Sequence, residues 1–152
     1  MRIAIKVLGF AIPLSLAMAS QAQAPAVVAL TPDEMKFATV GLALAGMSQA
    51  NLVGDPAKPG PYTIRLKFPD GYKLAPHSHP DAREVTILEG TWLTGYGKTF
   101  DPVALKELRA GSFYTEPANL PHFVQTRGSV LIQVSGTGPS GRQFVNPADN
   151  PQ

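Results

Sequence analysis

Residues 62–68 read Tyr-Thr-Ile-Arg-Leu-Lys-Phe, an unbroken alternation of side chains that face opposite sides of an extended chain. A period of two is typical of a β-strand that buries one of its faces. Pro69-Asp70-Gly71 follows at once and has the composition of a turn. This stretch therefore predicts a half-buried strand that ends in a sharp reversal of the chain.

Similar short segments continue on the C-terminal side. Strands are predicted over residues 74–79, 85–88, 91–96, 105–108, 112–115, 122–125 and 130–134. Pairs rich in Gly and Pro separate them, at 80–81, 89–90, 101–102, 110–111, 117–119 and 127–128. Evenly spaced short strands with such turns indicate an all-β sandwich or barrel. One short helix is expected over 31–37, because Thr31 and Glu34 form a capping box around Pro32.

The first 24 residues have the pattern of a secretory signal peptide. Arg2 and Lys6 precede a short apolar run, and small residues at 19–24 offer cleavage points. The apolar run is short for a membrane span, although an uncleaved N-terminal anchor is the alternative. With no Cys in the chain, lipid anchoring of a lipoprotein type is excluded. We expect a secreted or periplasmic protein without stable membrane anchoring after cleavage.

Charge gives no sign of a polyanionic partner. The chain has 13 basic and 11 acidic residues, and without Arg2 and Lys6 eleven of each remain. An even scatter of both signs is the ordinary surface of a globular protein, so nucleic acid is not expected as a partner.

The absence of Cys also means that a packed core, rather than disulfides, must stabilise the exported domain. We expect an N-terminal extension with the first strands over 25–60, a barrel over 61–136 and an irregular tail over 137–152.

All three histidines of the chain stand in positions suited to a metal. His77 and His79 are separated by one residue, so on a strand both imidazoles face the same side. Glu84 follows after a turn, and a bulge is needed if it is to face the same side. His122 would come from a distant strand. Three imidazoles and one carboxylate suit a divalent Fe, Mn, Ni, Cu or Zn ion.

Two longer motifs surround these residues. The stretch 71–79, Gly-Tyr-Lys-Leu-Ala-Pro-His-Ser-His, is followed by Glu84 and Gly90 and resembles the first cupin motif. The stretch 111–122, Gly-Ser-Phe-Tyr-Thr-Glu-Pro-Ala-Asn-Leu-Pro-His, resembles the second. The chain is therefore similar to a small, secreted, single-domain cupin. The resemblance implies a double-stranded β-helix, or jelly-roll, barrel that binds one metal ion through His77, His79, Glu84 and His122.

The sequence departs from the cupin pattern at three points. Five residues separate Glu84 from Gly90, where the pattern usually has six. Asn119 stands at a Gly position, which Asn can replace because it tolerates left-handed backbone. Thr126 stands where the second motif often ends in Asn. Glu89 is the competing carboxylate, although its place at a turn favours exposure.

Other side chains near the motifs have less certain roles. By parity with Glu84, we expect Thr86 and Leu88 to line the interior and Arg83 to face the surface. Four aromatic residues are either pocket walls or ordinary core: Trp92, Tyr96, Phe113 and Tyr114.

The resemblance leaves several functions open, because one fold supports many activities. The leading hypothesis is a metal-dependent enzyme, dioxygenase-like, that acts on a small organic molecule. The alternatives are a barrel that binds a metal or small ligand without turnover, and a barrel in which the metal is structural. By analogy with cupins, a homodimer is possible. No pair of arginines that would identify an acidic substrate is apparent.

Overall fold

A computed structural model describes residues 27–39 and 46–150. The predicted signal peptide lies outside these ranges. Within them, no helix is long and apolar enough to cross a membrane.

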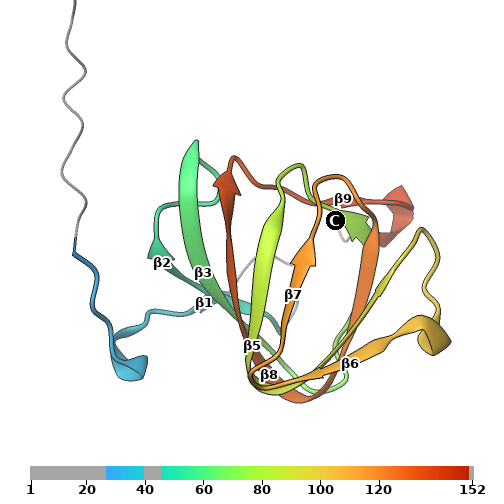
Figure 1. Ribbon diagram of the computed structural model, residues 1–152, viewed down its shortest axis with the longest axis horizontal. Helices are drawn as coiled ribbons and strands as arrows, with labels where there is room; N and C mark the ends of the chain where they lie inside the picture. Colours follow the sequence, from blue (N-terminus) through green and yellow to red (C-terminus); the bar gives the residue numbers. More distant parts are fainter. Residues whose placement is uncertain (1–26, 40–45, 151–152) are drawn as a thin grey trace, which may run out of the picture.

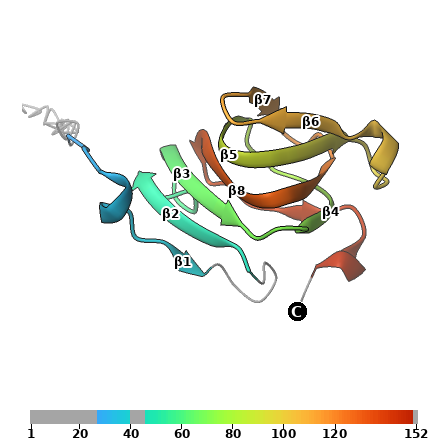
Figure 2. The ribbon, with the colours of Figure 1, turned by 90° about the horizontal axis from the view of Figure 1, so that it is seen from below.

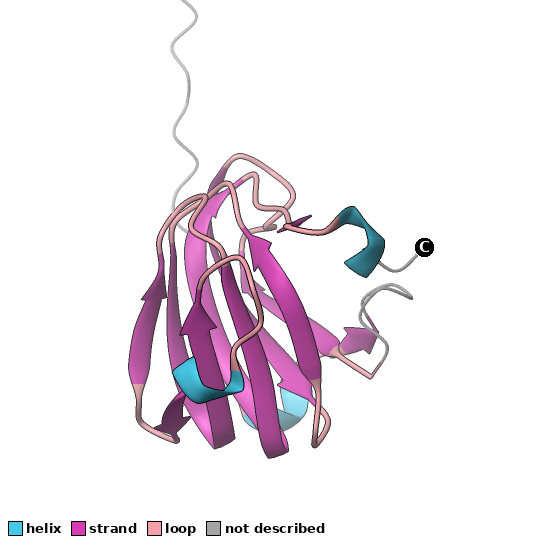
Figure 3. Cartoon of the chain, turned by 90° about the vertical axis from the view of Figure 1, so that its right-hand side faces the viewer, coloured by secondary structure: helices cyan, strands magenta, loops and turns pink. Residues whose placement is uncertain are grey.

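The described chain is almost entirely β-structure, with helix only as single 3₁₀ turns (Figure 3). Its elements in chain order are η1 (Pro32–Glu34), β1 (Ala38–Thr39), β2 (Ser48–Val53), β3 (Gly60–Phe68), β4 (Lys73–Ser78), β5 (Arg83–Tyr96), η3 (Pro102–Ala104), β6 (Lys106–Arg109), β7 (Phe113–Glu116), β8 (His122–Gly138), β9 (Gln143–Phe144) and η4 (Pro147–Asp149). The helix expected over 31–37 is thus only the turn η1, although the carboxylate of Glu34 does accept from the backbone N–H of Thr31 at 2.7 Å.

All strands belong to one sheet that curls on itself (Figures 1 and 2). The hydrogen-bonded order is β1-β2-β3-β8-β4-β9, and β5 joins β8 to β6 and β7. All ladders are antiparallel. This architecture confirms the predicted jelly-roll barrel.

Two long strands form the spine of the barrel. The segments predicted separately over 85–88 and 91–96 are both in β5, and those over 122–125 and 130–134 are both in β8. The two strands pair with each other on both sides of a bend at Gly90 and Gly128, where the backbone has positive φ. Glycine allows the chain to turn a barrel corner there without ending the ladder.

The interior is filled by side chains from both halves of the barrel. Val85 and Ile87 of β5 are fully buried, together with Ile132 and Val134 of β8. Thr86 and Leu88, expected inside, are only partly buried. The prediction for these two residues was therefore wrong by one position. It placed them on the same face of the strand as Glu84, and the side chain of Glu84 is exposed.

Candidate metal centre

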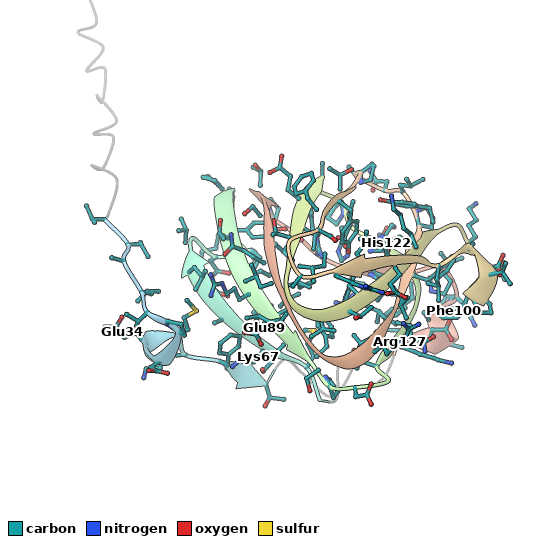
Figure 4. The ribbon with its side chains drawn as sticks, turned by 60° about the horizontal axis from the view of Figure 1, so that its bottom comes forward. Glu34, Lys67, Glu89, Phe100, His122 and Arg127 are labelled. Carbon is teal, nitrogen blue, oxygen red and sulfur yellow. The ribbon has the colours of Figure 1, made fainter. Side chains whose placement is uncertain are left out.

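Strands β4 and β8 bring the three histidines together inside the barrel. His77 pairs with His122 across the β4–β8 ladder, and a register shift after Leu74 turns His77 inward. All three side chains are buried, and a nitrogen of each lies within 4.8 Å of those of the other two. Figure 4 shows His122 among the side chains enclosed by the sheet, apart from Glu89 at the bend.

Each imidazole has its Nδ1 against a backbone carbonyl. Nδ1 of His77 lies 2.8 Å from the oxygen of Ala75, and Nδ1 of His79 contacts that of Gly141. Nδ1 of His122 lies 3.4 Å from the oxygen of Leu120. A carbonyl oxygen only accepts, so the contact with Ala75 puts the proton of His77 on Nδ1 and leaves its Nε2 a free lone pair, the form that binds metals. Nδ1 of His79 also lies 3.0 Å from Nη1 of Arg83, which only donates.

Burial keeps the rings of His77 and His79 neutral. It lowers the pKa of His77 to about 2, with further lowering by the neighbouring His122. Burial likewise lowers the pKa of His79 to about 3, aided by the positive charge of Arg83. Both rings are therefore uncharged ligands over the physiological pH range.

The carboxylate that faces the histidines is Glu116, at the end of β7. Its Oε1 lies 3.3 Å from Nε2 of His122, and its Oε2 lies 3.8 Å from Nε2 of His79. The side chain is only 3% exposed. Sequence analysis did not select this residue, although it stands in the second motif beside Pro117.

A chain of hydrogen bonds and an ion pair orients Glu116. Nε1 of Trp92 donates to the hydroxyl of Tyr114 at 2.9 Å, and that hydroxyl donates to Oε1 of Glu116 at 2.7 Å. Nε of Arg83 lies 2.8 Å from Oε2. Burial alone would raise the pKa of Glu116, but Arg83 together with the contacts to His122 and His79 outweighs it and holds that pKa well below its usual range. Glu116 is therefore a buried carboxylate anion.

Arg83 occupies the inward position that had been expected for Glu84. Arg83 is paired with Glu116 across β5 and β7, and its side chain is 11% exposed. Glu84 is exposed and lines a hollow of about 530 Å³ that none of the three histidines borders. The structure thus brings His77, His79 and His122 together and leaves Glu84 on the opposite face of the strand.

A signal for this arrangement was present in the sequence. The cupin pattern usually has six residues between its acidic position and the following Gly, and counting six back from Gly90 reaches Arg83 rather than Glu84. The spacing therefore places an arginine at the acidic position of the motif, and the structure supplies a carboxylate from β7 instead.

The donor set fits a metal cation. Nε2 of His79 and Nε2 of His122 are buried and make no hydrogen bond with any described residue, whereas Oε2 of Glu116 is ion-paired with Arg83. Two buried nitrogens without a partner are unfavourable, and a bound cation would satisfy both. Metal–nitrogen bonds of about 2.0–2.1 Å allow two donors on one ion to lie at most about 4.2 Å apart. The three histidine nitrogens, within 4.8 Å of one another, would have to move closer together to share one ion.

A cavity of about 290 Å³ lies beside the histidines. It is bordered by His79, Arg83 and Arg142, by the apolar side chains of Ile64 and Leu66, and by six further residues: Gln49, Pro56, Ala57, Tyr62, Ser140 and Gly141. The tail expected to be irregular thus contains β9 and places Gly141 and Arg142 at the site. The pair of arginines was not apparent from the sequence, because 58 residues separate them.

Comparison with known proteins supports the architecture. No family model matches the chain. Germin-like protein 1-1 of Oryza sativa subsp. japonica is 35% identical over 65 residues, 42% of this chain and 30% of that protein. Germin-like protein 5-1 of the same rice is 31% identical over 119 residues, 70% of this chain and 52% of that protein. The chain thus spans about half, or less, of the length of these curated relatives.

Solved structures show the same fold at low sequence identity. The polyketide cyclase RemF from Streptomyces resistomycificus superposes with a TM-score of 0.67 at 16% identity, covering 82% of this chain and 89% of that one. A salicylate 1,2-dioxygenase from Pseudaminobacter salicylatoxidans gives 0.53 at 12% identity, covering 66% and 30%. An oxalate oxidase gives 0.52 at 21% identity, covering 70% and 60%.

The two sequence motifs, the curled antiparallel sheet and the three histidines that converge inside it agree with these similarities. The described chain thus has the cupin fold, and its sequence is similar to part of the germin-like proteins.

Proposed function

We propose that this protein is a metal-dependent enzyme, dioxygenase-like, that acts on a small organic molecule bound in the cavity beside His79. The observation that carries the proposal is the pair of buried imidazole nitrogens, Nε2 of His79 and Nε2 of His122, which have no hydrogen-bond partner among the described residues and face the anionic Glu116. A bound cation satisfies both nitrogens, and a cavity borders His79.

In this proposal, His77, His79 and His122 hold one divalent ion of Fe, Mn, Ni, Cu or Zn, and Glu116 supplies the negatively charged donor. The ion when bound supplies Lewis-acid or redox chemistry. Glu84 has no part in the site, since its exposed side chain points away from the histidines.

The protein groups around the ion have distinct roles. The backbone carbonyls of Ala75, Leu120 and Gly141 orient the three rings. Tyr114 and Arg83 hold the carboxylate of Glu116 in place. The apolar wall formed by Ile64 and Leu66 excludes water from one side of the cavity.

Support for oxidative chemistry comes from similarity alone. Two of the structural neighbours are a salicylate 1,2-dioxygenase and an oxalate oxidase, whereas RemF is a polyketide cyclase. Imidazole and carboxylate donors suit redox-active Fe and Mn as well as Zn.

A second candidate is a barrel that binds a ligand without turnover. It is favoured by the engagement of Glu116, whose two oxygens already face Tyr114 and Arg83. A carboxylate held in this way, with its pKa kept low, is a poor general base.

We also propose that the protein acts after export, as a secreted or periplasmic protein, and that it forms a homodimer. The first proposal rests on the signal-like residues 1–24 and the second on the prevalence of two-fold dimers.

The metal proposal is tested by purifying the exported protein under metal-replete, anaerobic conditions and measuring its metal content by mass spectrometry. We expect about one equivalent in the wild type and in Glu84→Gln, and a large loss in His77→Ala and His122→Ala. A wild type without stoichiometric metal overturns the proposal, and metal retained by both histidine variants places the site elsewhere.

Turnover is tested separately by oxygen uptake with a panel of phenols, thiols and diketones. Uptake that disappears in His122→Ala supports an enzyme. Saturable binding of a panel member with no change in it over many hours supports the non-catalytic barrel.

A further inference from the structure

We propose that the cavity beside His79 binds a small carboxylate, and that the guanidinium of Arg142 recognises the carboxylate group. The inference deepens the proposed function and rests on it, because it assigns a substrate class to the same cavity.

The charges around the cavity leave Arg142 without a partner. Arg83 is neutralised by Glu116, with 2.8 Å between Nε and Oε2. The other buried carboxylate nearby, Asp81, accepts from the hydroxyl of Tyr62 at 2.6 Å. Within residues 27–39 and 46–150, Arg142 forms no ion pair with any carboxylate. Of the two arginines that line the cavity, Arg142 is therefore the one that no described carboxylate pairs with.

The Nε of Arg142 is also buried without a hydrogen bond to any described residue. Burial lowers the pKa of Arg142 to about 10, with a further contribution from Arg83, so the group stays charged at neutral pH. Arg142 as a whole is partly buried, and its guanidinium carbon lies 5.9 Å from the ring centre of Phe144. A partly desolvated guanidinium without a carboxylate partner is suited to an anion. The planar, two-donor edge of a guanidinium matches a carboxylate.

The position of Arg142 connects anion binding to the metal site. The preceding residue, Gly141, accepts from Nδ1 of His79, so the backbone that carries Arg142 also orients a metal-binding ring. Both His79 and Arg142 line the same cavity. A molecule anchored at Arg142 thus lies in the same small cavity that His79 borders.

The remaining walls limit the rest of the ligand. The cavity volume of about 290 Å³ is at the small end for organic ligands. Ile64 and Leu66 provide an apolar side opposite the charged groups. These features favour a monocarboxylate with a short apolar body over an inorganic anion, which would leave that side without a contact.

The test measures binding of propionate and benzoate to the protein as purified, by calorimetry, with propionamide and benzamide as uncharged counterparts of the same shape. We expect the carboxylates to bind and the amides to bind at least tenfold more weakly. Arg142→Gln should weaken carboxylate binding at least tenfold, and Arg142→Lys should recover part of it. The exposed Arg109, paired with Glu107, is the matched control, and Arg109→Gln should bind as the wild type does.

Two further readouts separate a recognition role from a structural one. Arg142→Gln should retain its metal content, and its melting temperature without ligand should equal or exceed that of the wild type, because an unpaired buried charge is removed. Inorganic phosphate should bind more weakly than propionate.

Equal carboxylate affinity in Arg142→Gln and wild type, equal affinity for the amides, or preference for phosphate overturns the inference. Absence of stoichiometric metal in the wild type overturns the proposed function instead, so the two failures are distinguishable.

Discussion

At the scale of single residues, the main finding is that the acidic group of the site comes from an unexpected strand. Glu84 lies five residues after His79, yet its side chain is exposed, while Glu116 faces two histidines from β7. Side chains alternate along β5, so Arg83 and Glu84 must face opposite sides of the strand, and only one of them can point inward. The inward position is taken by Arg83, whose charge Glu116 balances.

The two glutamates give a direct prediction. Glu116→Gln should weaken metal binding roughly 10- to 100-fold, because a charged donor that faces the ion is lost. Glu84→Gln should leave the affinity unchanged. Competition with a chromophoric chelator measures both. Equal losses in the two variants would contradict the assignment of Glu116.

A substitution of Tyr114 tests whether the hydrogen bonds that hold Glu116 affect metal affinity. Tyr114→Phe keeps the ring but removes the hydroxyl that donates to Oε1 of Glu116 and accepts from Trp92. We expect metal affinity to fall roughly tenfold, the effect typical of losing a hydrogen-bonded partner of a ligand. The same chelator competition reports it, and Tyr96→Phe is the control. An affinity like that of the wild type would show that Arg83 alone orients the carboxylate.

At the scale of elements, the bend shared by β5 and β8 shapes the barrel. Turn-like pairs at 89–90 and 127–128 predicted strand ends, but the two strands bend together and continue. Each strand thereby changes partner. β5 pairs with β7 before the bend and with β6 after it, while β8 pairs with β4 and then with β3. Without this change, β4, β7 and β8 would not meet at the metal site.

The bend predicts unequal effects of two glycine substitutions. Both Gly90 and Gly128 have positive φ, but a Cβ on Gly90 would lie 2.2 Å from the carbonyl oxygen of Ser129, whereas none is met at Gly128. Gly128→Ala should cost about 1 kcal/mol from backbone strain, and Gly90→Ala about 3 kcal/mol, because the clash adds to it. Urea unfolding measures the difference, and similar costs would argue against a tight β5–β8 contact.

At the scale of the whole molecule, the barrel buries its titratable groups and so makes its stability depend on pH. The folded pKa values of His77 and His79, about 2 and 3, lie below the ordinary value of 6.5. The folded protein therefore keeps both rings neutral, whereas the unfolded chain protonates them below about pH 6.5. The free energy of unfolding thus decreases as the pH falls below that value.

This dependence is measurable in chelator-treated protein. Between pH 8 and pH 5, each of the two histidines should lower the free energy of unfolding by up to about 2 kcal/mol, because the unfolded chain takes up the protons. Urea titrations at pH 8, 6 and 5 test this, with His77→Gln expected to show a shallower decline. A stability that does not change between pH 8 and 5 would contradict the burial of neutral rings.

Prediction from sequence succeeded where local pattern is decisive. Alternating stretches such as 62–68 located eight strand segments, and the spacing of His77 and His79 placed both rings on one face. Asn119 has φ of 61°, as expected for Asn at a Gly position. Local pattern predicted strands within 25–60 but did not locate β2, whose residues 48–53 alternate weakly and become a strand through pairing with β3.

The sequence by itself determined the all-β class, the cupin motifs and the three histidines, because each depends on periodicity or spacing along a short segment. Only the tertiary structure decided which carboxylate faces the histidines and that Arg83 and Arg142 share a cavity. The physical reason is that the side a strand residue faces is set by register, and register is fixed by partners far away in the chain. Arg83 is turned inward opposite Glu116, 33 residues away, and Arg142 reaches the site only because β9 pairs with β4.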